Sequence, residues 1–327
     1  MTPINGFDAF LGPAVNRYFG EGYRKTEYTI SQLRQRTDPP GTLTAVAGVH
    51  YSPDWSLKAG LRRTPHLSTL DALVLGAWLG QAHLAGIGLS PGSVSRAWMP
   101  EVAVRAGRRP VQDLGAIALS ASVVHEAASE IPGWMRTQLT TKVGPLVCLV
   151  TLEHDPPGRA GAARSSLFLE ARPETYTTAF RSTRHVFEPG TIGELGMQGR
   201  VRFEPALSPP PSGLAAAYWP SPVFIDHLVI AGQMAEVVLA CVRSAHGRDS
   251  SSNLWMRQIS MRAPGPRLPL EGDAHGAIRN HREGQHKGVR WRSFETQAMV
   301  AGVEILCRVA DVRPLDQQER VERSTAG

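Results

Sequence analysis

The chain has 327 residues, of which 42% are hydrophobic and 20% are charged, and its formal net charge is +6. This composition is typical of a globular protein and excludes a disordered chain or one built of membrane spans. The basic residues form no stripe with interleaved aromatic side chains, so we expect no nucleic-acid partner.

The first half of the chain predicts a strand, a long buried helix and further strands. A helix is expected from Leu70 to Ala85, where nearly every residue is apolar. A helix with no polar face must be buried on most sides. Asp71 near its start argues against a membrane span, because such spans carry few charges. Two later stretches are expected to be strands: AWMPEVAVRAG at 97–107 and KVGPLVCLVTLEHD at 142–155.

The second half repeats the first in the same order. Three segments return at offsets of 152, 155 and 157 residues: VHYSPDWS at 49–56 as VRFEPALS at 201–208, TLDALVLGAWLGQAHLA at 69–85 as FIDHLVIAGQMAEVVLA at 224–240, and WMPEVAVRAG at 98–107 as WMRQISMRAP at 255–264. The second helix is expected from Val223 to Val242. Apolar residues occupy every second position of 303–309, which is the pattern of a half-buried strand. Because the repeated unit has the size of a domain, the sequence predicts a duplicated domain and not a solenoid.

The duplication sets the expected domain boundaries. These are a first unit at 1–155, a linker at 156–190, a second unit at 191–313 and a flexible tail at 314–327. In each unit a strand precedes one helix and several strands follow it. A curved antiparallel sheet wrapped around a single helix satisfies this order, and it belongs to the α+β class and not to the doubly wound parallel sheets.

The sequence predicts a cytoplasmic protein without a metal centre. The stretch MTPINGFDAF lacks the basic patch and apolar run of a secretory signal. The three cysteines lie in apolar surroundings without CxxC spacing, which predicts buried free thiols at Cys148, Cys241 and Cys307. Three histidines lie in or near an expected Gly- and Arg-rich loop around 279–292: His275, His281 and His286. Their spacing differs from that of common zinc sites.

The layout is similar to the hotdog fold, in which a curved sheet wraps one long apolar helix, and the duplication resembles a tandem double hotdog. SPVFIDHLVIAGQ at 221–233 is similar to the helix start of the second hotdog in polyketide dehydratase domains, where a leucine-leucine-aspartate opens the helix. A glutamine usually follows that aspartate by four positions. Ile230 stands there in this chain, so the sequence departs from the dehydratase pattern.

Two stretches together resemble the avirulence D (AvrD) family: PHLSTLDALVLGAWLGQAHLAG at 65–86 and PVFIDHLVIAGQMAE at 222–236. The resemblance implies an enzyme of secondary metabolism that joins a β-ketoacyl chain to a sugar-like polyol, giving a signal molecule of the syringolide type. The A-factor synthases follow a related logic. The implied substrate is a thioester of coenzyme A or of an acyl carrier protein, with no further cofactor. We also expect a monomer or homodimer, and no membrane contact, because polar residues interrupt both apolar helices.

Three residues near the helix starts are the candidates for catalysis. Asp226 lies in the first turn of an almost wholly apolar helix, where burial favours the protonated carboxyl and hence a general acid. Asp71 is its counterpart, but Ser68 precedes it by three positions, and this capping pattern explains the aspartate without chemistry. His66 lies where the chain enters the first helix and can act as a base. In dehydratases of this fold a histidine of one hotdog works with a carboxylate of the other, so the resemblance implies a pair of His66 and Asp226.

Two alternatives to the condensing enzyme stay open. The same histidine and carboxylate could serve a dehydratase or isomerase that acts on a β-hydroxyacyl thioester, by removing the α-proton and protonating the hydroxyl. The chain could also be a hotdog that binds an acyl ligand without catalysis. Dependence of the reaction on a polyol distinguishes the condensing enzyme from both.

Overall fold

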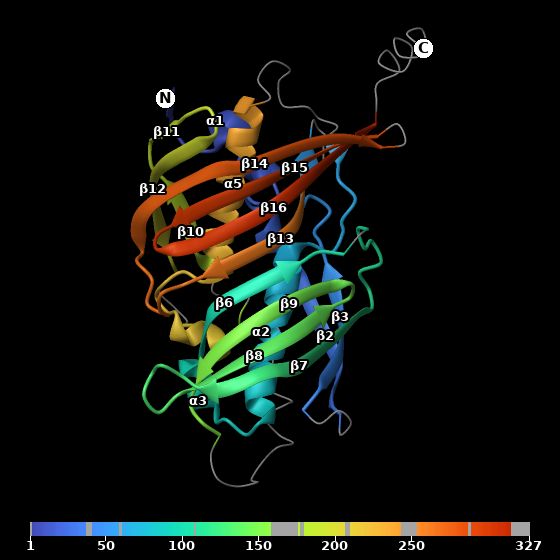
Figure 1. Cartoon of the computed structure of the whole chain (residues 1–327), viewed down its shortest axis with the longest axis vertical. Helices are drawn as coiled ribbons and strands as arrows, with labels where there is room; N and C mark the ends of the chain where they lie inside the picture. The colour runs from blue at the N-terminus through green and yellow to red at the C-terminus, as the bar shows by residue number, and fades with distance from the viewer. Residues whose placement is uncertain are drawn as a thin grey trace.

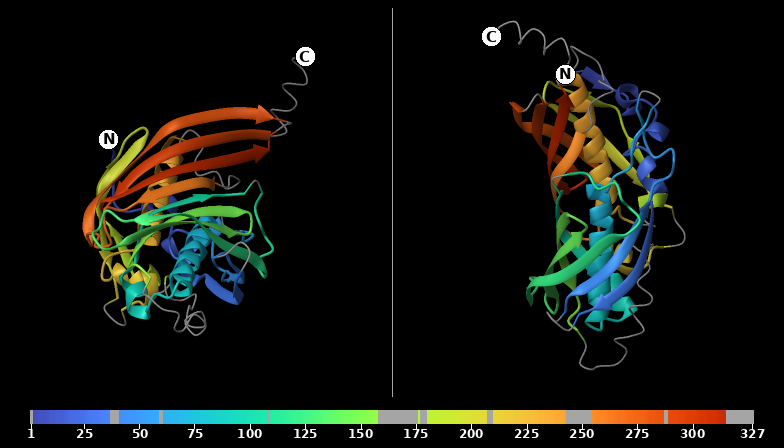
Figure 2. Two further views of the ribbon diagram at one scale, coloured as in Figure 1. Left: turned by 60° about the horizontal axis from the view of Figure 1, so that its bottom comes forward. Right: turned by 90° about the vertical axis from the view of Figure 1, so that its right-hand side faces the viewer.

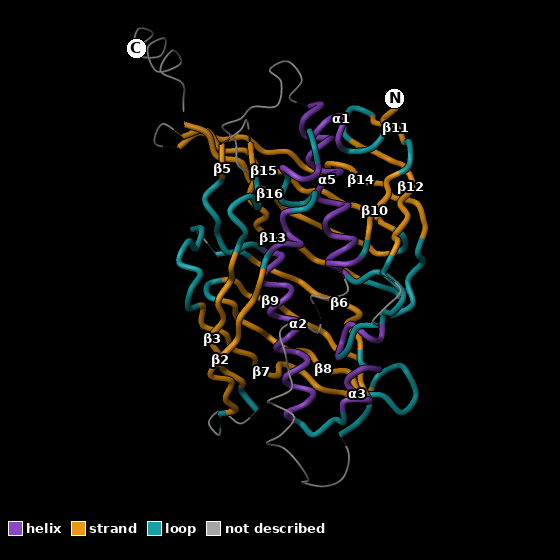
Figure 3. The backbone as a smooth tube through the Cα atoms, turned by 180° about the vertical axis from the view of Figure 1, so that it is seen from behind, coloured by secondary structure: helices purple, strands orange, loops and turns teal. Residues whose placement is uncertain are grey.

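The computed structural model describes residues 2–36, 41–58, 61–107, 109–157, 176, 180–206, 210–242, 254–286 and 289–314. One 14-stranded sheet, antiparallel in every pairing, curves around two long helices, α2 (Thr69–Gly86) and α5 (Phe224–Val242). The helix α5 lies behind the upper half of the sheet and α2 behind the lower half (Figures 1 and 3). Figure 2 shows the sheet bending around α2, so that the first strands lie on its far side.

The strands fall into two sets that extend outward from the centre of the sheet. The first set, from the centre, is β6 (Trp98–Arg105), β9 (Leu146–His154), β8 (Met135–Val143), β7 (Ile117–Ala128), β3 (Leu43–His50) and β2 (Glu27–Gln35). The second set is β13 (Leu254–Arg262), β16 (Val303–Pro314), β15 (Val289–Val300), β14 (Glu271–His286) and β12 (Gly196–Glu204), which pairs with both β10 (Arg184–Phe187) and β11 (Gly190–Ile192). The two sets have the same order, as a duplicated domain requires.

The two copies meet through their repeated strands, β6 and β13. Ala103 pairs with Ser260, and these residues are equivalent at the repeat offset of 157, so the register on either side of them is symmetric. A β-bulge also recurs at the equivalent place, between Trp98 and Glu101 in one copy and between Met256 and Gln258 in the other. The central pair of strands therefore carries an approximate twofold axis, and the tandem double hotdog of the α+β class is confirmed.

Both central helices are buried in the hydrophobic core, as their apolar composition predicts. Every residue of α2 is buried. Gly76 lets the sheet approach closely, because a Cβ there would meet Thr141 Oγ1 at 3.1 Å. The stretch Phe224–Cys241 of α5 is long and apolar enough to cross a membrane, but 72% of it is buried inside the protein. It is the core helix of the second hotdog, in agreement with the argument against a membrane span.

The structure corrects the sequence prediction in one place and adds detail in another. Residues 279–292, expected to be a loop, belong mainly to the strands β14 and β15. Side chains on both faces of this part of β14 are exposed, so the strand shows no apolar alternation. The expected linker 156–190 includes β10 and the first residue of β11, although most of residues 158–179 lie outside the described part. Residues 315–327 of the expected tail also lie outside it, whereas Pro314 ends β16.

The amino-terminal segment joins the second copy and not the first. The strand β1 (Thr2–Ile4) pairs with β11, and α1 (Asp8–Leu11) packs against α5. The three cysteines are free, as expected; Cys148 is buried, and Cys241 and Cys307 are half-buried. Residues 2–11 therefore pack with the second copy, although they precede the first copy in the sequence.

Candidate functional site

A pocket of about 460 Å³ lies at the start of α2. Its walls are the start of α2, the second half of α5, the beginning of β13 and the amino-terminal residues 16–19. The small hairpin of β4 (Leu57–Lys58) and β5 (Leu61–Arg62) contributes to its rim. The lining combines apolar side chains such as Phe19, Leu239 and Trp255 with arginines, so the pocket offers both an apolar surface and positive charge.

His66 lines this pocket, two residues before the helix cap. Its carbonyl oxygen lies 3.2 Å from the Tyr51 hydroxyl, whose single proton it shares with the nearer Asp71 Oδ2. Its ring stands edge-on to Trp55, with centroids 6.2 Å apart. The side chain is half-buried, which leaves the imidazole accessible to a molecule in the pocket.

Asp71 lies behind the pocket wall and is fully buried. It forms the capping box predicted from the sequence: Ser68 N–H and Ser68 Oγ both donate to Asp71 Oδ2 at 2.7 Å, and Asp71 N–H donates to Ser68 Oγ. Tyr28 donates to Oδ1 at 2.8 Å, and Tyr51 donates to Oδ2. Burial raises the pKa of Asp71, and these hydrogen bonds oppose that shift. Asp71 thus holds the start of α2 in place but does not itself line the pocket.

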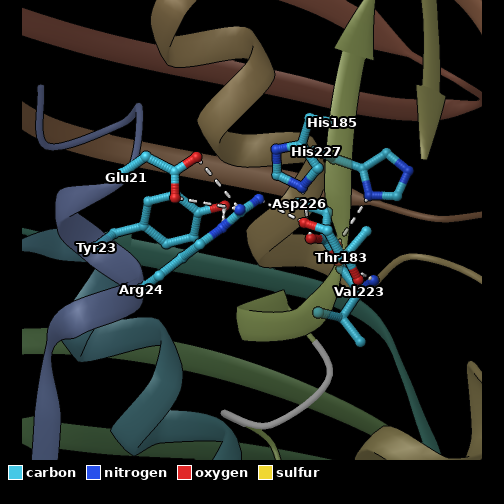
Figure 4. Close-up of polar contacts among 8 residues, drawn as sticks. All are labelled: Glu21, Tyr23, Arg24, Thr183, His185, Val223, Asp226 and His227. Atoms are coloured by element: carbon cyan, nitrogen blue, oxygen red, sulfur yellow. Dashed lines mark hydrogen bonds and ion pairs between the residues drawn. The ribbon is translucent and has the colours of Figure 1, made fainter. Parts of the chain in front are cut away.

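Asp226 occupies the equivalent position at the start of α5 and is also fully buried (Figure 4). Its Oδ2 accepts a hydrogen bond from Val223 N–H at 2.8 Å, which is half of a capping box without the serine. Its Oδ1 lies 2.8 Å from His185 Nε2 on β10. His227, the next residue, points away, with Nδ1 3.0 Å from the carbonyl oxygen of Val223. Burial lowers the pKa of His227 to about 4.

The structure does not bring His66 and Asp226 together. Asp226 precedes Glu236, the first pocket residue of α5, by ten positions, which is about 15 Å along a helix. The partner of Asp226 is His185, a residue in the expected linker that no sequence pattern marked. The expected histidine and carboxylate pair is therefore replaced by two separate features, a pocket with His66 and a buried pair of His185 and Asp226.

In the second copy, residues of the described part fill the place equivalent to the pocket. Gln81 and Met99 correspond to the pocket residues Glu236 and Met256 at the repeat offsets. Gln81 Oε1 accepts a hydrogen bond from Leu214 N–H at 3.0 Å, and the Tyr218 hydroxyl bonds to both N–H and C=O of Met99 at 2.9 Å. Leu214 and Tyr218 belong to the segment with the short helix η4 (Gly213–Ala217), and both are fully buried. The segment that forms an open hairpin in the first copy therefore fills the cavity in the second.

The described residues contain no cluster of three or more His, Cys, Asp or Glu side chains that could hold a metal ion. Residues that sequence reasoning missed include His185, Tyr51 and the arginines of the pocket. Arg62 and Arg63 are visible in the sequence as a basic pair, but only the fold shows that they line one pocket with Arg257 from the other copy.

One family model matches nearly the whole chain: the model described as "Pseudomonas avirulence D protein (AvrD)" covers residues 3–314. No curated protein matches the sequence.

Solved structures of similar arrangement include an acyl-CoA thioesterase II, TesB2, from Mycobacterium marinum, the dehydratase CurJ, and a 12:0-ACP thioesterase from Umbellularia californica. Their sequence identities are 9%, 9% and 8%, and their TM-scores are 0.38, 0.36 and 0.36. The matches cover 88%, 88% and 84% of this chain and 96%, 96% and 95% of the other chains. These likenesses concern the arrangement of the chain alone.

Proposed function

The chain belongs to the family of the Pseudomonas avirulence D protein (AvrD), and we propose that it is a cytoplasmic enzyme that transfers the acyl group of a β-ketoacyl thioester to a hydroxylated small acceptor. The pocket at the start of α2 carries the proposal. Its volume of about 460 Å³ suits a small-molecule ligand, and its apolar walls suit an acyl chain.

In this proposal His66 is the general base. Its imidazole accepts the proton of the acceptor hydroxyl while the oxygen attacks the thioester carbonyl. The carbon–sulfur bond then breaks, and the leaving thiolate takes the proton from the imidazolium, which yields an ester and a free thiol. The start of α2, at Ser68 and Thr69, faces the same pocket, and the positive end of a helix dipole favours the negative charge on the carbonyl oxygen.

The two aspartates receive positioning roles in the same proposal. Asp71 holds Ser68 and Tyr51, and Tyr51 in turn holds the carbonyl of His66. Asp226, which resemblance to dehydratases implied as the acid, is buried away from the pocket and secures the start of α5 with His185. A dehydratase that uses His66 with Asp226 would need these side chains at one site.

The test is an incubation with a β-ketoacyl thioester, with and without a polyol acceptor, following thiol release and product mass. We expect release that depends on the acceptor and is strongly reduced by His66→Gln. The exposed His50 provides the matched control, since His50→Gln removes a histidine outside the pocket. Water loss from a β-hydroxyacyl thioester without acceptor would establish a dehydratase instead, and binding without turnover of either substrate would establish an acyl-binding protein.

A further inference from the structure

The pocket beside α2 carries an excess of positive charge. The charged side chains among the described lining residues are Arg17, Arg62, Arg63, Arg109, Arg257 and a single acidic one, Glu236. Arg17 is engaged within the protein, because it pairs with Asp8 and donates to Gln233 Oε1 at 2.6 Å. Arg62, Arg109 and Arg257 form no ion pair with a side chain in the described part of the chain. These three guanidinium groups are therefore available to a ligand.

The three arginines reach the pocket from separate segments. Arg62 lies on the β4–β5 hairpin, Arg109 follows β6, and Arg257 is on β13 of the second copy. Arg62 and Arg109 are exposed, whereas Arg257 is half-buried. Like charges gathered at one place repel one another, and an anion relieves that repulsion. A planar guanidinium is also suited to bidentate hydrogen bonds with phosphate oxygens.

We propose that this arginine rim, defined by Arg62, Arg109 and Arg257, binds a phosphate ester carried by one of the substrates. The inference rests on the proposed function, because it assigns the charged end of a ligand whose acyl end lies on the apolar walls. Two substrates can supply the phosphate: coenzyme A as the carrier of the thioester, or the hydroxylated acceptor as a sugar phosphate. The chemistry recognised is the same in both cases.

The experiment measures binding by calorimetry at constant ionic strength, without turnover, for two matched pairs of probes. One pair is coenzyme A and pantetheine, and the other is D-ribulose 5-phosphate and D-ribulose. We expect the phosphate-bearing member of at least one pair to bind at least tenfold more tightly. Arg257→Gln and Arg109→Gln should each reduce that preference by threefold or more. The pair that responds identifies the source of the phosphate.

Arg34→Gln is the matched control, because Arg34 is an exposed arginine on β2 that does not line the pocket. Equal affinity within both pairs would overturn the proposal, as would a preference that both pocket variants leave unchanged. Turnover of a pantetheine thioester with an unphosphorylated acceptor is measured separately. Turnover without a preference for the phosphate-bearing probes would overturn the phosphate site but not the proposed reaction. A preference for those probes without turnover would overturn the proposed reaction but not the phosphate site.

Discussion

Asp71 and Asp226 hold the same place in the two halves of the molecule. Each is the third residue of its helix, and each accepts a hydrogen bond from the backbone N–H three positions earlier, at 2.7 Å from Ser68 and 2.8 Å from Val223. The other oxygen differs, since Tyr28 reaches Asp71 and His185 reaches Asp226. Because the same geometry occurs beside an open pocket and beside a closed one, securing the helix start accounts for both aspartates.

Replacing Asp226 tests this role. Asp226→Ala removes the hydrogen bonds to Val223 and His185, and we expect the free energy of unfolding to fall by about 1–3 kcal/mol, since both partners are left buried and unpaired. Urea unfolding measures the loss, with Asp113→Ala at an exposed aspartate as the control. Turnover per folded molecule should be retained. Loss of turnover with unchanged stability would instead give Asp226 a chemical role.

His66 is expected to act on the reaction and not on the fold. His66→Gln should reduce kcat by roughly 10²- to 10⁴-fold, the usual contribution of a general base. The side chain is half-buried and its backbone is held through the carbonyl, so the thermal midpoint should stay near that of the unmodified protein. Steady-state kinetics at saturating thioester measures the change, and full activity in this variant would rule out His66 as the base.

The segment 213–218, which fills the cavity of the second copy, depends on a glycine. Gly213 has φ +61°, and a Cβ there would lie 2.0 Å from Gln81 Oε1, the acceptor of the Leu214 hydrogen bond. Gly213→Ala should lower the free energy of unfolding by about 1–2 kcal/mol for the left-handed backbone, and by about 1–3 kcal/mol more for the displaced hydrogen bond. Gly133→Ala is the matched control, with φ +80° and open space around it. Equal losses in urea unfolding would show that Gln81 does not depend on close contact with Gly213.

Two buried histidines predict acid sensitivity. Burial lowers the pKa of His83 and of His227 to about 4, below the value near 6.5 of a free histidine. Between pH 6.5 and 4 the unfolded chain binds protons on both residues that the folded chain excludes. The free energy of unfolding therefore falls as the pH falls through this window, by on the order of 1–3 kcal/mol per histidine, and the stabilisation is complete above pH 6.5.

The measurement is urea unfolding at pH 7, 6 and 5. His227→Gln and His83→Gln should each flatten the dependence on pH, whatever their effect on stability at pH 7. If the free energy of unfolding depended on pH equally in both buried variants and in the unmodified protein, His83 and His227 would not be the source of the acid sensitivity.

The fold was predictable from the sequence in those elements where burial of one or more faces imposes a regular spacing of apolar residues. The apolar stretches of α2 and α5, the strands β6 and β13 and the capping box at Asp71 were all visible, because each depends on local periodicity or on a three-residue spacing. The strand β14 was missed since both of its faces are exposed near residues 279–285, and a strand without a buried face leaves no alternating pattern.

The site was less predictable than the fold because it depends on contacts between distant segments. His66 was correctly placed at the entry to the first helix, and it lines the pocket. Its pairing with Asp226 followed from resemblance to dehydratases, and the geometry separates the two. His185 carried no signal, since it lies in a short strand between stretches without periodicity, and only the pairing of β10 with β12 sets it against Asp226.

The closed second cavity also has a consequence for ligand stoichiometry and for evolution. In a dimer of two identical chains, every substitution appears in both chains. A segment that fills the cavity of one chain must therefore fill the cavity of the other. In a fused pair the segment 213–218 can occupy one cavity while the strands β4 and β5 leave the other open. One chain should therefore bind one molecule of each substrate, at the one open site, and the second half contributes wall residues such as Trp255 and Arg257 to that site.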